Sequence, residues 1–241
     1  MKNIYLIMKK ELDTYFFSLM AYLILSAFLI GGSWLFMHGF FIINQATMRG
    51  FFGILPWLFL IFIPAITMRS WAEERKLGTI EFLLTQPVTE VQLVLGKFLA
   101  SFLFVCVALF LTFPIVLTVF SLGNPDPGPI IGGYVGALFM SAAFIAIGEF
   151  ISSLCENQII ALIMQIMVLF IFIIIGENFV MFTIPPKLQW LAIVFKHISL
   201  SSHFANMSRG IIDSRDVLYY VIVTLSFLYL NVKSIQFRRL Q

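Results

Sequence analysis

The densest group of ionisable side chains lies in the stretch MRSWAEERKLGTIEFLLTQPVTEVQLVLGK. The charged residues Glu73, Glu74 and Arg75 come shortly before two leucines, Leu83 and Leu84. Apolar side chains exposed beside charged ones are typical of a docking surface, because a partner that covers them removes apolar area from water. The stretch therefore indicates that another protein binds here.

Two further carboxylates, Glu149 and Glu177, stand in or beside apolar stretches. A charged side chain at the centre of a bilayer costs roughly 2.5 kcal/mol or more, so it usually faces the interior of a helix bundle or water. Each is a candidate for an intramembrane pathway or for a contact between two copies. The alternative is a structural carboxylate that is hydrogen-bonded or reaches the membrane interface.

The histidines and cysteines, which could bind metal or take part in catalysis, match no catalytic or metal-binding motif. The spacing of His38, His197 and His203 fits no zinc or copper ligand pattern, and Cys106 and Cys155 form no CxxC pair. HExxH and GxSxG motifs are absent from the sequence. We expect no metal and no catalytic residue in this chain.

The one Gly-Lys pair, Gly96-Lys97, does not belong to a phosphate-binding loop. Val91 stands where the first glycine of such a loop would be, and Phe98 stands where Ser or Thr would follow the lysine. We therefore expect no cofactor in this chain, and any nucleotide-driven step needs a separate ATPase.

The elements that position these residues must be membrane helices. The 241 residues are 61% hydrophobic and 11% charged, whereas soluble domains are roughly 45–50% apolar and about 25% charged. The net charge is +3, and the sequence has no block of basic residues long enough to suggest binding to nucleic acid. The composition predicts an all-α integral membrane protein.

Six segments are long enough and apolar enough for a helical span of about 20 residues. They are Phe16–Met37, Gly50–Met68, Phe98–Leu122, Pro129–Leu154, Ile159–Met181 and Val217–Val232. Prolines inside the second and third spans (Pro56, Pro64 and Pro114) are expected to kink them or shape their packing. In the fourth span, Gly132 and Gly136 have the GxxxG spacing that permits close helix approach.

Lysines and arginines predict the orientation of these spans. With the N-terminus in the cytoplasm, ten of the 15 lie on the cytoplasmic side, which places both termini there. The uncharged run from Thr14 to Gln45 is too long for a signal peptide and indicates an uncleaved first span. Before it, residues 1–15 carry apolar side chains at helical spacing, which predicts an amphipathic helix along the membrane surface.

Two connections are longer than a hairpin needs. The outer one, 183–216, is apolar enough to lie in the interface or to re-enter the membrane, with one short helix from about Lys187 and a second ending at Gly210. An ordinary capped loop is the alternative. The other connection, 69–97, is predicted to be cytoplasmic.

The cytoplasmic connection contains several helix boundaries. We expect the second span to continue as a polar helix over Arg69–Leu77, with Gly78 as its stop in the left-handed region. Thr79 is then the N-cap of a short helix, Ile80–Thr85. We expect the residue before Pro87 to have an extended backbone, because proline disfavours the helical region at that position.

The third span opens with a second local signal. Thr89 and Gln92 have the spacing of a capping box. We expect Lys97, one turn further on, to extend to the lipid headgroups.

These residues resemble a known family. The run EERKLGTIEFLLTQPVTEVQLVLGK is similar to the coupling-helix region of ABC-2-type permeases, and most similar to the gliding-motility-associated and nitrous-oxide-reductase-associated branch. The turn SSLCENQIIA and the segment HFANMSRGIIDSRDVLYY extend the resemblance over most of the chain. Cys155 departs from it, since a small hydroxylated residue is expected there.

The resemblance implies a bacterial inner-membrane permease subunit, in which the short helix sits in a groove of an ATPase subunit that binds ATP and Mg. The implied partners are that ATPase, a second permease copy or a paralogue and, in gliding-type assemblies, an extracytoplasmic auxiliary subunit. The residues implied in coupling are Glu73, Glu74, Arg75, Gly78, Thr79, Glu81, Leu83, Leu84 and Pro87.

Three other functions stay open at the level of sequence. A gradient-driven secondary transporter would use Glu149 or Glu177 to carry protons, but no internal repeat supports it. A membrane-embedded enzyme would need clustered catalytic residues within the spans. The same permease fold could also apply ATP-driven force to an extracytoplasmic apparatus instead of exporting a substrate.

Overall fold

The computed structural model describes residues 2–43, 45–79, 88–183 and 189–239, and within these ranges all regular structure is helical. In chain order the helices are α1 (Lys2–Phe16), α2 (Leu19–Ile43), α3 (Arg49–Thr67), α4 (Arg69–Lys76), α6 (Glu90–Phe110), α7 (Phe113–Leu122), α8 (Pro127–Leu154), α9 (Gln158–Ile174), α10 (Asn178–Thr183), α11 (Gln189–Ile198), α12 (Leu200–Met207) and α13 (Ser214–Arg239).

Among the described residues, five helical stretches are long and apolar enough to cross a membrane. They are Leu19–Ile42, Arg49–Lys76, Glu90–Leu122, Pro127–Leu154 and Ser214–Phe237. A sixth apolar helix, α9, is shorter. The chain is therefore an all-α, multi-pass membrane protein, as its composition predicts.

The fifth predicted span is shorter than expected. We expected a helix to Met181, but α9 ends at Ile174 and α10 is a separate helix. At the break, a Cβ atom on Gly176 would collide with the Ser199 side chain, so the chain turns where α12 begins to pack against it. The longer boundary was wrong because this close contact comes from residues far along the chain.

The third predicted span is divided, and the sixth is longer than predicted. Thr112 separates α6 from α7, and its hydroxyl donates to the Leu109 carbonyl at 2.6 Å. Pro114 lies in the first turn of α7, where its missing N–H costs nothing. The break is therefore at the proline that the sequence marked, whereas Pro56 and Pro64 stay inside α3.

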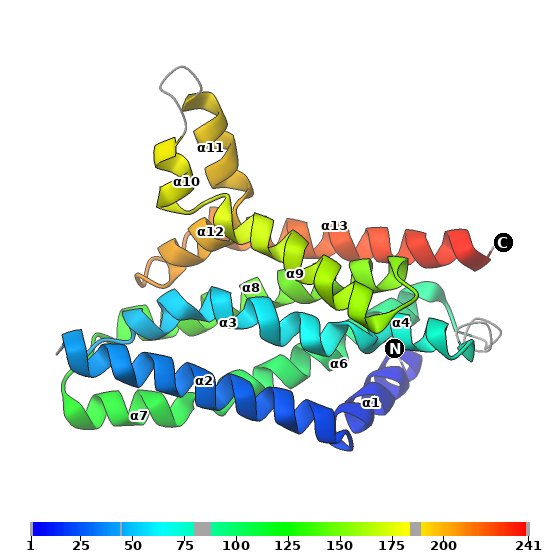
Figure 1. Ribbon diagram of the computed structural model, residues 1–241, viewed down its shortest axis with the longest axis horizontal. Coiled ribbons are helices and arrows are strands. Elements are labelled where there is room, and N and C mark those ends of the chain that lie inside the picture. The colour runs from blue at the N-terminus through cyan, green and yellow to red at the C-terminus, as the bar shows by residue number, and fades with distance from the viewer. Residues whose placement is uncertain (1, 44, 80–87, 184–188, 240–241) are drawn as a thin grey trace.

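Helix α8 is the centre of the bundle. It packs against α3, α4, α6, α9, α12 and α13. In Figure 1 the long helices run along the long axis, while α10 and α11 project sideways from it. The start of α1 and the end of α13 lie towards the same end of the bundle as α4.

Small residues allow two close helix contacts. A Cβ atom on Gly132 or Gly136 of α8 would press into Met207 of α12, so the predicted close approach is confirmed, with α12 as the partner. A Cβ atom on Gly96 of α6 would collide with Ile7 of α1. The second contact seats α1 against α6 beside Lys97.

Candidate functional site

Helix α4 begins at a break after α3 that one serine stabilises. Between α3 and α4, the backbone N–H groups of Trp71 and Ala72 donate to Ser152 Oγ of α8 at 3.2 and 3.3 Å. The same hydroxyl donates to the Met68 carbonyl at 3.0 Å. Since Trp71 and Ala72 are fully buried, no water can replace this hydroxyl, and α4 is fixed to α8.

A buried lysine joins three helices at the base of α4. Lys97 of α6 is 2% exposed, and its Nζ lies 2.9 Å from Glu11 Oε1 of α1 and 2.8 Å from Glu74 Oε1 of α4. Nζ also lies 5.0 Å from the centroid of the Trp71 ring, a cation–π distance. The expectation that Lys97 extends to the headgroups is wrong, because two carboxylates compensate its charge inside the protein.

The end of α4 is held as well. Arg75 Nη1 donates to the Cys155 carbonyl at 3.0 Å, which links α4 to the turn after α8. Gly78 has φ +68°, so the predicted left-handed stop is confirmed. The Thr79 hydroxyl donates to the Glu74 carbonyl at 3.2 Å, so in this structure it binds the end of α4.

The other end of the connection is also anchored. Gln92 N–H donates to Thr89 Oγ1, and Thr89 N–H donates to the Gln92 side chain, which confirms the capping box. Asn3 Nδ2 of α1 donates to Gln92 Oε1 at 3.4 Å. One end of the segment is thus tied to the turn after α8, and the other end is tied to α1.

Five of the nine residues implied in coupling lie in the described ranges. Glu73, Glu74 and Arg75 belong to α4, and Gly78 and Thr79 follow it. Glu81, Leu83, Leu84 and Pro87, together with the expected helix Ile80–Thr85, lie outside the described residues.

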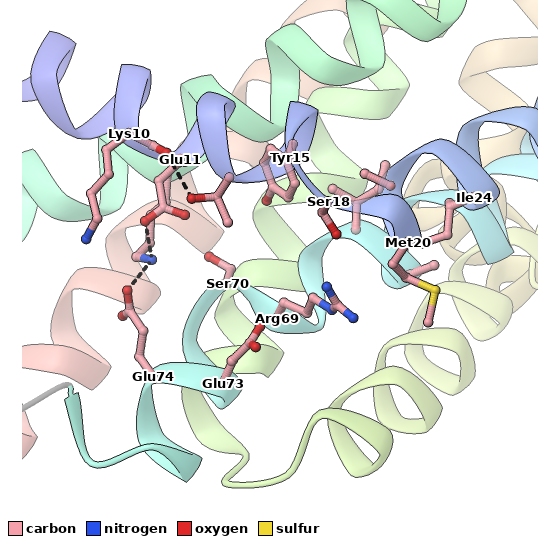
Figure 2. Close-up of a pocket in the computed structure, with 15 residues that line it drawn as sticks. Lys10, Glu11, Tyr15, Ser18, Met20, Ile24, Arg69, Ser70, Glu73 and Glu74 are labelled. Atoms are coloured by element: carbon pink, nitrogen blue, oxygen red, sulfur yellow. Dashed lines mark hydrogen bonds and ion pairs between the residues drawn. The ribbon is translucent and has the colours of Figure 1, made fainter.

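A cavity of about 220 Å³ lies beside this junction, between α1, the start of α2 and the α3–α4 break (Figure 2). Its walls include Glu11, Tyr15, Arg69, Glu73 and Lys97. Burial raises the pKa of Tyr15 well above its usual value, so its hydroxyl stays neutral at physiological pH.

Glu149 is buried within this chain. Its side chain is 0% exposed, and Oε1 accepts a hydrogen bond from Ser101 Oγ at 3.2 Å. The Ser101 hydroxyl also contacts the Tyr15 hydroxyl at 3.1 Å, so the carboxylate of α8 is linked through α6 to α1. Its Oε2 has no hydrogen-bond partner among the described residues.

Glu177 lies in a different region, between α9 and α10. Its Oε1 accepts a hydrogen bond from Ser201 Oγ of α12 at 3.2 Å. The structure therefore does not bring Glu149 and Glu177 together, and their roles in a pathway or a dimer contact stay predictions.

The histidines form no metal centre with other possible ligands. Within the described residues, no three side chains from His, Cys, Asp and Glu gather closely enough to hold an ion. His203 instead contacts Asp216 Oδ1 through Nδ1 at 2.6 Å and the His197 carbonyl through Nε2 at 3.1 Å. These contacts join α12 to the start of α13 and to the end of α11.

Sequence reasoning missed Ser152 and the ion pairs of Lys97. Ser152 carries no local signal, because its backbone partners lie about 80 residues earlier in the chain. For Lys97, the available signal was an isolated cation in a stretch otherwise apolar after Gln92. Such a charge is rare enough in a span to suggest a buried partner.

Comparison with known protein families gives a match over most of the chain. A family model described as ABC-2 family transporter protein matches residues 42–232, which is most of the chain and includes α3, α4, α6 and α8. The curated proteins contain no significant match.

Proposed function

The chain belongs to the ABC-2 transporter family, and we propose that it is a permease subunit whose segment 79–87 docks on a separate ATPase subunit. The ATPase binds ATP and Mg, and its closure moves α4. The membrane-spanning helices then either export a substrate or apply force to an extracytoplasmic apparatus.

One observation carries this proposal. The short helix α4 contacts three parts of the bundle through Ser152, Lys97 and the Cys155 carbonyl. A displacement at the segment after Gly78 would therefore reach α1, α6 and α8 together. A loosely held loop could not transmit such a displacement.

The finer assignments follow from the resemblance in sequence. We place both termini and segment 69–97 in the cytoplasm of a bacterial inner membrane, and 183–216 on the outer side. A second permease copy or a paralogue completes the complex. The sequence resembles the gliding-motility-associated and nitrous-oxide-reductase-associated branch, so we place the complex in that branch, with an extracytoplasmic auxiliary subunit if it is a gliding-type assembly.

A gradient-driven transporter is the weaker alternative. The buried Glu149, with one carboxylate oxygen unpaired among the described residues, is the observation in its favour. Membership of the ABC-2 family favours the ATP-driven mechanism instead.

Substitution in the docking segment, or at Gly78 directly before it, is expected to release the ATPase. Gly78→Pro cannot keep a positive φ, because proline fixes φ near −65°, and Leu83→Asp places a charge on the proposed contact. The measurement is a pull-down of the tagged chain from native membranes, in which the captured ATPase is recognised by its GxxxxGK[ST] motif. We expect each variant to capture less than about a tenth of the ATPase that the wild-type chain captures, which corresponds to a loss of binding free energy of roughly 1.4 kcal/mol or more.

The matched control is Leu154→Asp. Leu154 is a 51% exposed leucine beside the Arg75 contact, but it lies outside the docking segment. The Leu154→Asp variant should capture as much ATPase as the wild-type chain. Equal capture by Leu83→Asp, Gly78→Pro and the wild-type chain would rule out docking through 79–87.

A further inference from the structure

The lining of the cavity beside α4 includes an apolar side and, at the start of α4, a polar side. Met20 and Ile24 of α2 and Ile66 of α3 line the apolar side, and Arg69 and Ser70 line the polar side. Met20 is 44% exposed, so the apolar side continues onto the outer surface of the bundle. A ligand with a charged head and an apolar tail matches this division.

Two buried donors on the polar side lack a partner among the described residues. The Ser70 side chain belongs to a residue that is 5% exposed, and its Oγ makes no hydrogen bond within the described ranges. Arg69 is half-buried as a residue, but its Nε is buried and also makes no hydrogen bond within the described ranges. Figure 2 shows Arg69 extending towards the start of α2, near Ser18 and Met20. Buried donors are normally satisfied, so these two donors favour a ligand that supplies an acceptor.

The geometry of Arg69 suits a phosphate oxygen. A guanidinium group presents its N–H donors in a planar fork that matches a phosphate group. Lys97 cannot take this role, since Glu11 and Glu74 already compensate its charge. Lys10 lies on the opposite side of the cavity from Arg69 (Figure 2).

Glu73 adds an acidic group to the same side. It lies one helical turn after Arg69, beside it in Figure 2, and it has no ion pair with another described residue. An adjacent cation and anion match a zwitterionic group, with a phosphate on Arg69 and an ammonium on Glu73.

The position of the cavity indicates which molecule would supply the zwitterionic group. Arg69 directly follows α3, and the apolar helix α2 begins at Leu19, so the polar side lies where two spans end. Headgroups occupy this level of a bilayer. We propose that the cavity binds the phosphoethanolamine headgroup of a phospholipid, whose acyl chains lie along Met20, Ile24 and Ile66. The proposal needs only the membrane location of the chain, and not ATPase docking.

Native mass spectrometry of the full chain in detergent tests this site. With phosphatidylethanolamine added, we expect one retained lipid per chain, and at least a tenfold lower occupancy for Arg69→Gln. Glu73→Gln should remove the preference for phosphatidylethanolamine over phosphatidylglycerol. Arg209→Gln changes an exposed arginine away from the cavity and should leave lipid occupancy unchanged.

Three outcomes would overturn the proposal. Arg69→Gln could retain as much lipid as the wild-type chain, or Glu73→Gln could keep the same headgroup preference. Inorganic phosphate could displace the lipid fully at equal concentration, which would indicate a site for free anions. If Arg69→Gln fails to fold, Arg69→Lys can be used instead, because it keeps the charge but lacks the planar set of guanidinium N–H donors. Unchanged lipid occupancy in Arg69→Lys would also contradict the proposal.

Discussion

A Lys97→Met variant is expected to unfold at a temperature roughly 10 °C below that of the wild-type chain. Methionine has nearly the length of lysine but no charge, so Glu11 and Glu74 would face each other without their shared cation. Removal of one member of a buried ion pair costs about 3–5 kcal/mol, because the remaining charge is left uncompensated. Thermal unfolding in detergent measures this loss.

Two controls separate the ion pairs from other effects of the substitution. Lys233→Met removes an exposed lysine at the end of α13 and should change the unfolding temperature little. The triple variant Lys97→Met, Glu11→Gln, Glu74→Gln removes all three charges and should recover much of the loss. A Lys97→Met protein as stable as the wild type would show that these contacts contribute nothing to holding α4.

A Ser152→Ala variant is expected to release α4 from α8. The buried N–H groups of Trp71 and Ala72 would lose their acceptor, and each unsatisfied donor costs about 1–3 kcal/mol. We expect a loss of stability of about 2–4 kcal/mol and faster hydrogen exchange at the Trp71 and Ala72 amides. Hydrogen-exchange mass spectrometry of the purified chain reads the second effect directly.

The neighbouring serine is a matched control. Ser153 is also buried, but its hydroxyl donates to the Phe150 carbonyl of its own helix at 2.7 Å and contacts Ser234 of α13. Ser153→Ala leaves no backbone N–H of α4 without a partner. Equal acceleration of exchange in α4 by both substitutions would contradict the role assigned to Ser152.

The parts of the fold that could be predicted depend on local signals. Gly78 stops α4 because glycine alone enters the left-handed region without a steric cost, and Thr89 and Gln92 cap α6 through residues three apart. Long apolar runs identified the spans for the same reason, since a bilayer selects each helix by its own length and composition.

The parts that could not be predicted depend on distant residues meeting in space. The close contact of Gly176 with Ser199 at the end of α9 is one example, and the burial of Lys97 beside Glu11 and Glu74 is another. No periodicity within a single helix encodes such contacts. The cavity is likewise formed by the meeting of α1, α2, α3 and α4, so the unpaired donors of Arg69 and Ser70 became visible only in the structure.

Site-specific photo-crosslinking in native membranes tests the docking of this permease on an ATPase most directly. A photoreactive amino acid at Leu84 should give a covalent adduct with a chain that carries a GxxxxGK[ST] motif. The same amino acid at Leu154 should give that adduct at a far lower yield. If Leu84 forms adducts only with lipid, or only with chains that lack the motif, segment 79–87 is not the ATPase contact and the coupling account is wrong.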